Sequence, residues 1–233
     1  MTYCAQMSSE LGDMVLCCDG TYLTGLYFTD QKDSPQPAGA TVPLHRSFGP
    51  AEGMLAGYPL KLLRARKISG DGPLFEAADS TESNPRAGIT QATGESRCDA
   101  SESFSLELMQ AVTPATALAV FEQTRQELSQ YFLGTRTAFT VPLQPDGSVF
   151  QKKVWRALLD IPFGEFVSYG DIARAVGLSP HHGRPVGTAV GRNPIAIIIP
   201  CHRVLSGTGR MTGYTGGLNR KLALLKLEGF SLG

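Results

Sequence analysis

The chain has no apolar run approaching the roughly 20 residues that a membrane-spanning helix needs. Residues 1–12 also lack the basic-then-apolar order of a secretory signal. We therefore expect a soluble protein without a membrane partner, in the cytoplasm, or in the nucleus of a eukaryote. Charge of one sign is not in excess, since 21 Lys and Arg residues balance 21 Asp and Glu residues. This balance excludes a protein that coats nucleic acid through total charge, but it leaves room for a local basic face.

Cysteine is too scarce and too irregularly spaced for a disulfide framework. The five cysteines are Cys4, Cys17, Cys18, Cys98 and Cys201. Free thiols in a reducing compartment are the favoured interpretation. A metal site using Cys4, with Cys17 or Cys18 and His45, is the alternative. We expect neither a metal nor a cofactor.

Charge is unevenly distributed along the chain. Residues 71–107 are acidic and rich in small residues, whereas the part from Lys152 onward is basic. Such asymmetry predicts that the C-terminal part meets an anionic partner, and a merely solvated surface is the alternative.

The first part of the chain predicts a small α/β domain over residues 1–145. Residues 14–18 and 22–28 are expected to be strands, joined by a hairpin at Asp19-Gly20. Over residues 30–105 periodicity fades, which predicts a long, partly disordered insertion. Residues 114–133 are expected to form a helix ended by Gly134. Its expected inner face comprises Leu118, Phe121, Arg125, Leu128 and Phe132.

The second part, residues 146–233, predicts a mostly helical domain. Helices are expected over 148–159 and 171–176, with a third that has Pro185 in its first turn and ends before Pro194. Short helices joined by a glycine-bearing connection are typical of a helix-turn-helix. The apolar, β-branched run 195–199 is expected to be a buried strand that leads into Cys201.

Cys201, followed directly by His202, is a candidate nucleophile with a neighbouring base. Successive side chains of a strand point to opposite faces, so a direct contact between the two requires a turn. A bridging water is the other possibility. The competing interpretation is an inert core thiol beside an ordinary buried histidine.

Further short motifs precede and follow the segment around Cys201. Motifs occur in order at Gly164-Glu165-Phe166-Val167-Ser168-Tyr169, Arg184-Pro185-Val186-Gly187, Asn193-Pro194, Pro200-Cys201-His202-Arg203-Val204 and Tyr214-Thr215-Gly216-Gly217. Over about residues 148–230 the sequence resembles the O6-alkylguanine-DNA alkyltransferases. The resemblance implies an α+β fold: an N-terminal RNase H-like α/β domain, followed by a mostly helical, winged helix-turn-helix-like DNA-binding domain.

The resemblance also implies a partner and a reaction. The partner is double-stranded DNA containing O6-alkylguanine, bound by a protein that is monomeric. The damaged base is flipped out through the minor groove, and Arg184 fills the gap in the stack. Gly183 lets the backbone approach the DNA, and Ser168 and Arg192 are further expected DNA contacts. The alkyl group of guanine, and also that on O4 of thymine, passes irreversibly to Cys201, so each molecule acts once.

The remaining roles follow from the same resemblance. Tyr169 supplies a proton or hydrogen bond to N3 of the leaving base, and His202 activates Cys201 through a water. Glu228 orients His202, and Asn193 ties the recognition helix to the active-site loop. Tyr214 and Thr215 line the base pocket. The carbonyls of Cys201 and Val204 accept from the guanine amino group.

Three other functions remain as alternatives. One is a non-catalytic sensor of alkylguanine, although such relatives typically carry tryptophan at the position of Cys201. Another is a cysteine hydrolase or transferase of small molecules, which has no use for a helix-turn-helix. The third is a DNA-binding regulator that responds to alkylation of Cys201.

Overall fold

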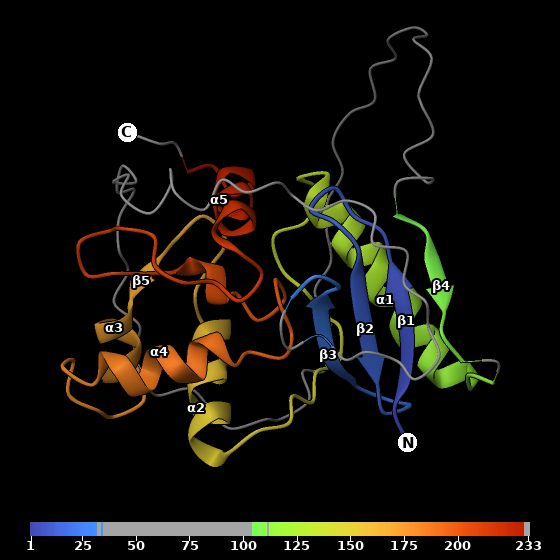
Figure 1. Cartoon of the computed structure of the whole chain (residues 1–233), viewed down its shortest axis with the longest axis horizontal. Coiled ribbons are helices and arrows are strands. Elements are labelled where there is room, and N and C mark those ends of the chain that lie inside the picture. The colour runs from blue at the N-terminus through green and yellow to red at the C-terminus, as the bar shows by residue number, and fades with distance from the viewer. Residues whose placement is uncertain (32–33, 35–103, 111, 231–233) are drawn as a thin grey trace, which may run out of the picture.

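The computed structural model describes residues 1–31, 34, 104–110 and 112–230 (Figure 1). Nearly all of the expected insertion over 30–105 lies outside the described residues, as do Cys98 and His45. Within the described part, helices and strands combine in a mixed α+β architecture, as expected. No helix there is both long and apolar enough to cross a bilayer.

A four-stranded antiparallel sheet forms the N-terminal part. Its strands are β1 (Tyr3–Met7), β2 (Met14–Cys18), β3 (Leu23–Phe28) and β4 (Leu106–Leu108), in the order β3-β2-β1-β4. The hairpin between β2 and β3 is confirmed. The carboxylate of Asp19 accepts from the backbone amides of Thr21 and Tyr22, and Gly20 has a φ of 116° that suits glycine. The edge strand β4 was not expected from the sequence.

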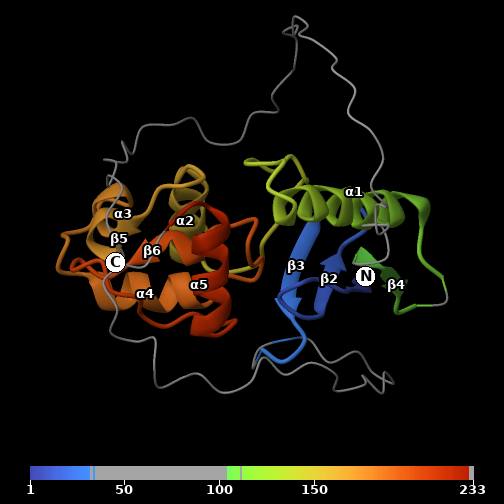
Figure 2. The same cartoon turned by 90° about the horizontal axis from the view of Figure 1, so that it is seen from above.

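Helix α1 (Ala115–Phe132) lies along one face of this sheet (Figure 2). Gly134, with a φ of 69°, ends it as expected. Its expected inner face was partly wrong, because Leu118 is 37% exposed and the side chain of Arg125 is only partly buried and pairs with Glu122. The buried stripe is rotated by about one position and comprises Ala117, Phe121, Thr124, Leu128 and Tyr131. Apolar residues stand next to one another at Ala117-Leu118 and Tyr131-Phe132, so spacing alone could not tell which member of each pair faces inward.

The C-terminal part is built from four helices and a short two-stranded parallel sheet. The helices are α2 (Val149–Leu159), α3 (Tyr169–Ala175), α4 (Gly183–Gly191) and α5 (Leu218–Leu227), and the strands are β5 (Val167–Ser168) and β6 (Val204–Leu205). Ser148 and Gln151 form a reciprocal capping box that starts α2. The indole of Trp155 donates to the carbonyl of Ala189 at 2.8 Å and so fixes α2 against α4.

The expected strand over residues 195–199 is wrong. The segment is buried but forms consecutive tight turns, and only Ile195 makes an isolated bridge, to Leu26 of β3. Ile197 has a φ of 68°, a strained conformation for a β-branched residue. A short run of apolar β-branched residues suits any buried segment, so composition could not distinguish a turn from a strand. The turns lead into a 3-10 helix, η2 (Cys201–Arg203).

Arg220 of α5 holds the helical part to the sheet. Its Nε donates to the carbonyl of Leu11 at 2.6 Å, and its two terminal nitrogens bind the carboxylate of Asp30 at 2.8 and 3.0 Å. The guanidinium also stacks over Phe28, 4.2 Å from the ring centroid. Helix α5 accordingly lies on the side of the helical part that faces the sheet (Figures 1 and 2).

The corrected face of α1 can be tested with two leucines of one helix. Leu128 is 0% exposed, so Leu128→Ala should lower the free energy of unfolding by about 2–5 kcal/mol through the cavity it leaves. Leu118→Ala removes the same atoms from an exposed site and should cost less than about 1 kcal/mol. Urea denaturation measures both, and equal losses would contradict the assignment.

Candidate functional site

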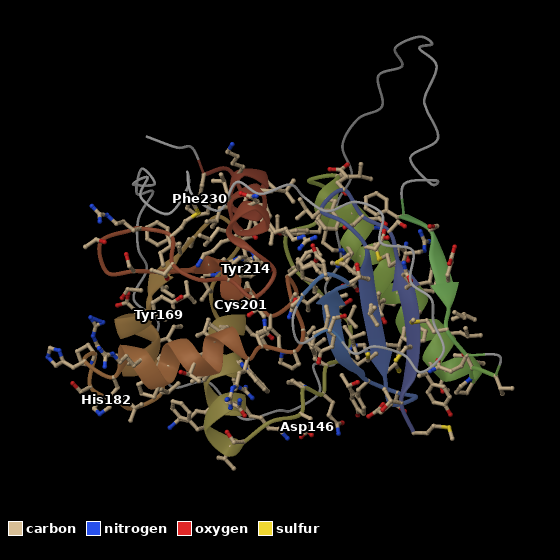
Figure 3. All side chains as sticks on the ribbon, in the orientation of Figure 1. Asp146, Tyr169, His182, Cys201, Tyr214 and Phe230 are labelled. Carbon is tan, nitrogen blue, oxygen red and sulfur yellow. The ribbon has the colours of Figure 1, made fainter. Side chains whose placement is uncertain are left out.

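A cavity of about 500 Å³ opens between α4 and the loop that precedes α5. It is lined by Tyr169, Gly183, Arg184, Gly187, Gly191, Thr212, Gly213, Tyr214 and Thr215. Figure 3 shows Cys201 between Tyr169 and Tyr214, whereas His182 lies at the outer end of the helical part. The structure thus brings together residues that are far apart in the sequence. Cys201 does not line the cavity, but its charge acts on Tyr169 and Tyr214, which do. The cavity is large enough for a purine base.

Tyr169 stands at the first position of α3, where a local sequence signal fixes it. Ser168 caps the helix, since its hydroxyl accepts from the amide of Asp171 while Asp171 accepts from Ser168. The hydroxyl of Thr212 donates to the phenol oxygen of Tyr169 at 3.0 Å, which leaves the phenol proton available to a ligand. Burial raises the pKa of Tyr169, so the phenol keeps that proton at neutral pH. Sequence reasoning missed Thr212, because only the fold brings it to Tyr169.

Cys201 is 7% exposed and receives a hydrogen bond from a side-chain amide. The Nδ2 of Asn193 donates to its Sγ at 3.1 Å and also to the carbonyls of Ile195 and Ile199, while the Oδ1 accepts from the amide of Ile195. Asn193 therefore holds the strained turn and the thiol together. Burial raises the pKa of Cys201, although Asn193 and the charge of Lys221 oppose this. The resting group is a thiol, and its deprotonation needs a base.

His202 is fully buried and is held by a buried carboxylate. Its Nε2 lies 2.8 Å from Oε1 of Glu228, and Arg203 binds both oxygens of the same carboxylate. Burial would raise the pKa of Glu228, but hydrogen bonds from His202 and Arg203 outweigh it and lower the pKa to about 2. Since an ionised carboxylate only accepts, Nε2 must carry the proton. The other nitrogen, Nδ1, has no partner among the described residues, and burial lowers the pKa of His202, so Nδ1 is an unprotonated base.

Lys221 is a buried cation that sequence reasoning did not assign. Its side chain is 0% exposed, and Nζ donates to the carbonyls of Val204 and Thr212 at 2.6 and 3.3 Å. Burial lowers the pKa of Lys221 to about 8, while the charge of a Cys201 thiolate opposes that shift. The lysine therefore anchors the loop beneath the cavity and favours negative charge on Cys201. No sequence pattern distinguished it from the surface lysines of a basic helix.

The loop before α5 closes the cavity. The hydroxyl of Thr215 donates to the carbonyl of Gly191 at 2.6 Å, which joins the loop to the end of α4. The hydroxyl of Tyr214 is buried with no partner among the described residues. Val204 contributes a carbonyl that already accepts from Lys221, and the carbonyl of Cys201 accepts from the amide of Val204. Each carbonyl oxygen keeps a second lone pair for a ligand.

The residues expected to contact DNA differ in how exposed they are. Arg184 and Arg192 are exposed at the two ends of α4, and Gly183 lines the cavity beside Arg184. The side chain of Ser168 is half-buried and engaged in its cap. In the described part of the chain, His, Cys, Asp and Glu nowhere gather in a group of three that could hold a metal. Cys4 and Cys17 do touch, with 3.5 Å between their sulfurs, but His45 is not among the described residues.

Comparison with known proteins shows which family the chain is related to. A family profile described as 6-O-methylguanine DNA methyltransferase, DNA binding domain, matches residues 149–230. The methylated-DNA–protein-cysteine methyltransferase of Methanosarcina acetivorans is 51% identical over 109 residues, which cover 47% of this chain and 69% of that protein. The chain belongs to this methyltransferase family.

Other methyltransferases extend the likeness. The methylated-DNA–protein-cysteine methyltransferase of Mycobacterium tuberculosis is 54% identical over 108 residues, 46% of this chain, so the match spans 65% of that relative's length. The crystal structure of the O6-methylguanine methyltransferase of the same species superposes with a TM-score of 0.59 at 30% identity, covering 98% of this chain and 93% of the other. A structure of the mycobacterial protein in complex with DNA superposes with a TM-score of 0.57 at 30% identity, covering 96% and 90%.

The charge of Glu228 should make stability depend on acid pH. Its folded pKa of about 2 lies below the ordinary value of 4.5, so its contribution is present above pH 4.5 and is lost as the pH falls toward 2. This loss amounts to about 3 kcal/mol. Glu228→Gln should be less stable at pH 7 but should show a shallower fall between pH 4.5 and 2.5. Urea denaturation at several pH values measures the two slopes, and parallel slopes would contradict the ionised assignment.

Proposed function

We propose that this chain repairs DNA by transferring a methyl or other alkyl group from O6 of guanine, and also from O4 of thymine, to Cys201. The observation that carries the proposal is the buried thiol of Cys201, with Asn193 on its sulfur and the His202–Glu228 pair following it in the chain, close enough to act on the two tyrosines of the cavity, Tyr169 and Tyr214. Membership of the methyltransferase family supports the same reaction.

The transfer is a displacement at the alkyl carbon. His202 takes the thiol proton of Cys201 through a water, the sulfur–carbon bond forms, and the carbon–oxygen bond to guanine breaks. The electron pair stays on the base, which gains a proton at N3 with Tyr169 as donor. The net change is a thioether on Cys201 and an unmodified guanine. A thioether has no easy route of hydrolysis, so the protein is consumed in a single turnover.

Access to the base requires that it leave the duplex. Arg184, exposed at the start of α4 and on the rim of the cavity, is placed to fill the gap left in the stack. Arg192 at the other end of α4 is proposed to contact phosphate, Ser168 to contact the backbone, and Gly183 to let the DNA approach closely. The partner is thus double-stranded DNA containing O6-alkylguanine.

Recognition of guanine over adenine is proposed to use main-chain oxygens. The free lone pairs on the carbonyls of Cys201 and Val204 would accept from the exocyclic amino group, which adenine lacks at that position. Tyr214 and Thr215 are proposed to line the base pocket, and Asn193 to couple α4 to the thiol.

Several finer expectations accompany this proposal. They are an RNase H-like N-terminal domain over 1–145, a winged helix-turn-helix-like domain over 146–233, a monomeric state, and a cytoplasmic or nuclear location. The alternatives remain a non-catalytic sensor and an alkylation-responsive regulator. The presence of a cysteine at position 201 favours transfer over the non-catalytic sensor, whose known representatives typically carry tryptophan there.

Incubation with duplex DNA that contains O6-methylguanine should add one methyl group to the tryptic peptide bearing Cys201, in a 1:1 ratio to protein. Mass spectrometry measures the adduct. Cys201→Ala should keep DNA binding and lose transfer entirely, because the acceptor atom is gone. Absence of transfer, or many turnovers per protein, would refute the proposed reaction.

Arg184→Ala should slow transfer from duplex DNA by about tenfold or more, since an empty gap in the stack costs a few kcal/mol. Reaction with the free base O6-benzylguanine needs no flipping and should stay within about twofold of the unmodified protein. Single-turnover rates on the two substrates test this. Equal effects on both would count against base flipping by Arg184.

A further inference from the structure

We propose that Tyr131, from helix α1 of the N-terminal part, is a positioning residue for alkyl transfer. Its phenol donates a hydrogen bond to Glu228 and so weakens the effect of that carboxylate on the pKa of His202. The inference rests on the proposed function, in which His202 is the base. Tyr131 lies outside residues 149–230, which match the family profile, and far in sequence from every residue of the site.

The placement of Tyr131 is fixed by packing as well as by its hydrogen bond. The side chain is 0% exposed, and its hydroxyl donates to Oε1 of Glu228 at 2.7 Å. Three aromatic rings hold it: Phe132, Phe139 and Phe163, with centroid separations of 5.7, 5.4 and 6.1 Å. Burial, and then the charge of Glu228, raise the pKa of Tyr131, so it remains a proton donor to the carboxylate.

Oε1 of Glu228 is the oxygen on which the network converges. It accepts from Tyr131 at 2.7 Å, lies 2.8 Å from Nε2 of His202, and accepts from Nη2 of Arg203 at 2.9 Å. Oε2 accepts from Nε of Arg203 at 2.9 Å and from the amide of Gly164 at 3.4 Å. Donors on one oxygen share its negative charge, so each weakens the attraction that the others feel.

This sharing affects the pH at which His202 becomes a base. A buried carboxylate beside a histidine favours the imidazolium, and an imidazolium cannot take the proton of Cys201. Burial lowers the pKa of His202 and Glu228 raises it, while Arg203 of η2 and Lys221 of α5 lower it further. By donating to Oε1, Tyr131 reduces the upward effect of Glu228 on the pKa of His202 and so extends to lower pH the range in which the imidazole is neutral.

Tyr131→Phe in the full chain isolates the hydroxyl, because the ring and its aromatic contacts remain. The rate of transfer from free O6-benzylguanine to Cys201 is measured against pH by mass spectrometry. The acidic limb of the profile should move up by about half to one pH unit, the shift that one hydrogen bond to the carboxylate is worth. The rate at the alkaline plateau should stay within about twofold. An unmoved acidic limb would overturn the inference.

Phe121→Leu is the matched control, since Phe121 is fully buried in the same helix but lies ten residues, nearly three helical turns, from Tyr131. This variant should lower the thermal midpoint and leave the acidic limb of the pH–rate profile unmoved. If the acidic limb shifts as it does in Tyr131→Phe, the effect of Tyr131 is one of packing only, and the inference is overturned.

An NMR titration of the imidazole of His202 in the unreacted protein separates this inference from the proposed function. Tyr131→Phe should raise the pKa of His202 by the same half to one unit, whether or not transfer occurs. If His202 titrates as expected but no alkyl group is transferred, the proposed function fails and the network stands. An unchanged titration overturns the role of Tyr131 even if transfer is intact.

Discussion

The carboxylate of Glu228 is the constraint on which the rest of this structure depends. A buried negative charge is costly unless it is paired and hydrogen-bonded, and here one carboxylate gathers side-chain donors from two separate elements: Tyr131 of α1, and His202 and Arg203 of η2. Glu228 itself follows α5. Satisfying this single charge therefore fixes how the N-terminal helix, the 3-10 helix that carries the thiol and the C-terminal helix meet, and it sets the tautomer of His202 at the same time.

Much of this arrangement could be predicted from the sequence. The β2–β3 hairpin and the extents of α1 and α2 follow from turn residues, caps and apolar spacing. The pairing of His202 with Glu228 was implied by the resemblance to the alkyltransferases. The edge strand β4 and the correct inner face of α1 were not predicted from the sequence. The run 195–199 was wrongly predicted as a strand, because burial alone explains its apolar composition. Tyr131, Thr212 and Lys221 carried no local signal. Their roles come from contacts across the fold, such as the 97 residues that separate Tyr131 from Glu228, and no periodicity encodes such a contact.

The segment that was mispredicted is central to the site. A strand would send Cys201 and His202 to opposite faces, whereas tight turns and a 3-10 helix carry both into the interior. Ile197 has a strained backbone, and Asn193 holds the turn by binding the carbonyls of Ile195 and Ile199 on either side of it. The same amide nitrogen reaches the sulfur of Cys201, so one side chain holds both the strained turn and the nucleophile.

The position of Glu228 in the chain has a consequence for synthesis. Chains grow from the N-terminus, so α1 and the thiol exist before Glu228, which follows His202 by 26 residues. Until that carboxylate is in place, His202 has nothing to fix its tautomer and Cys201 no oriented base. If the chain reacts once, as proposed, this order withholds the oriented base until Glu228 has been made, so the thiol of Cys201 gains its reactivity together with the contacts that Glu228 forms.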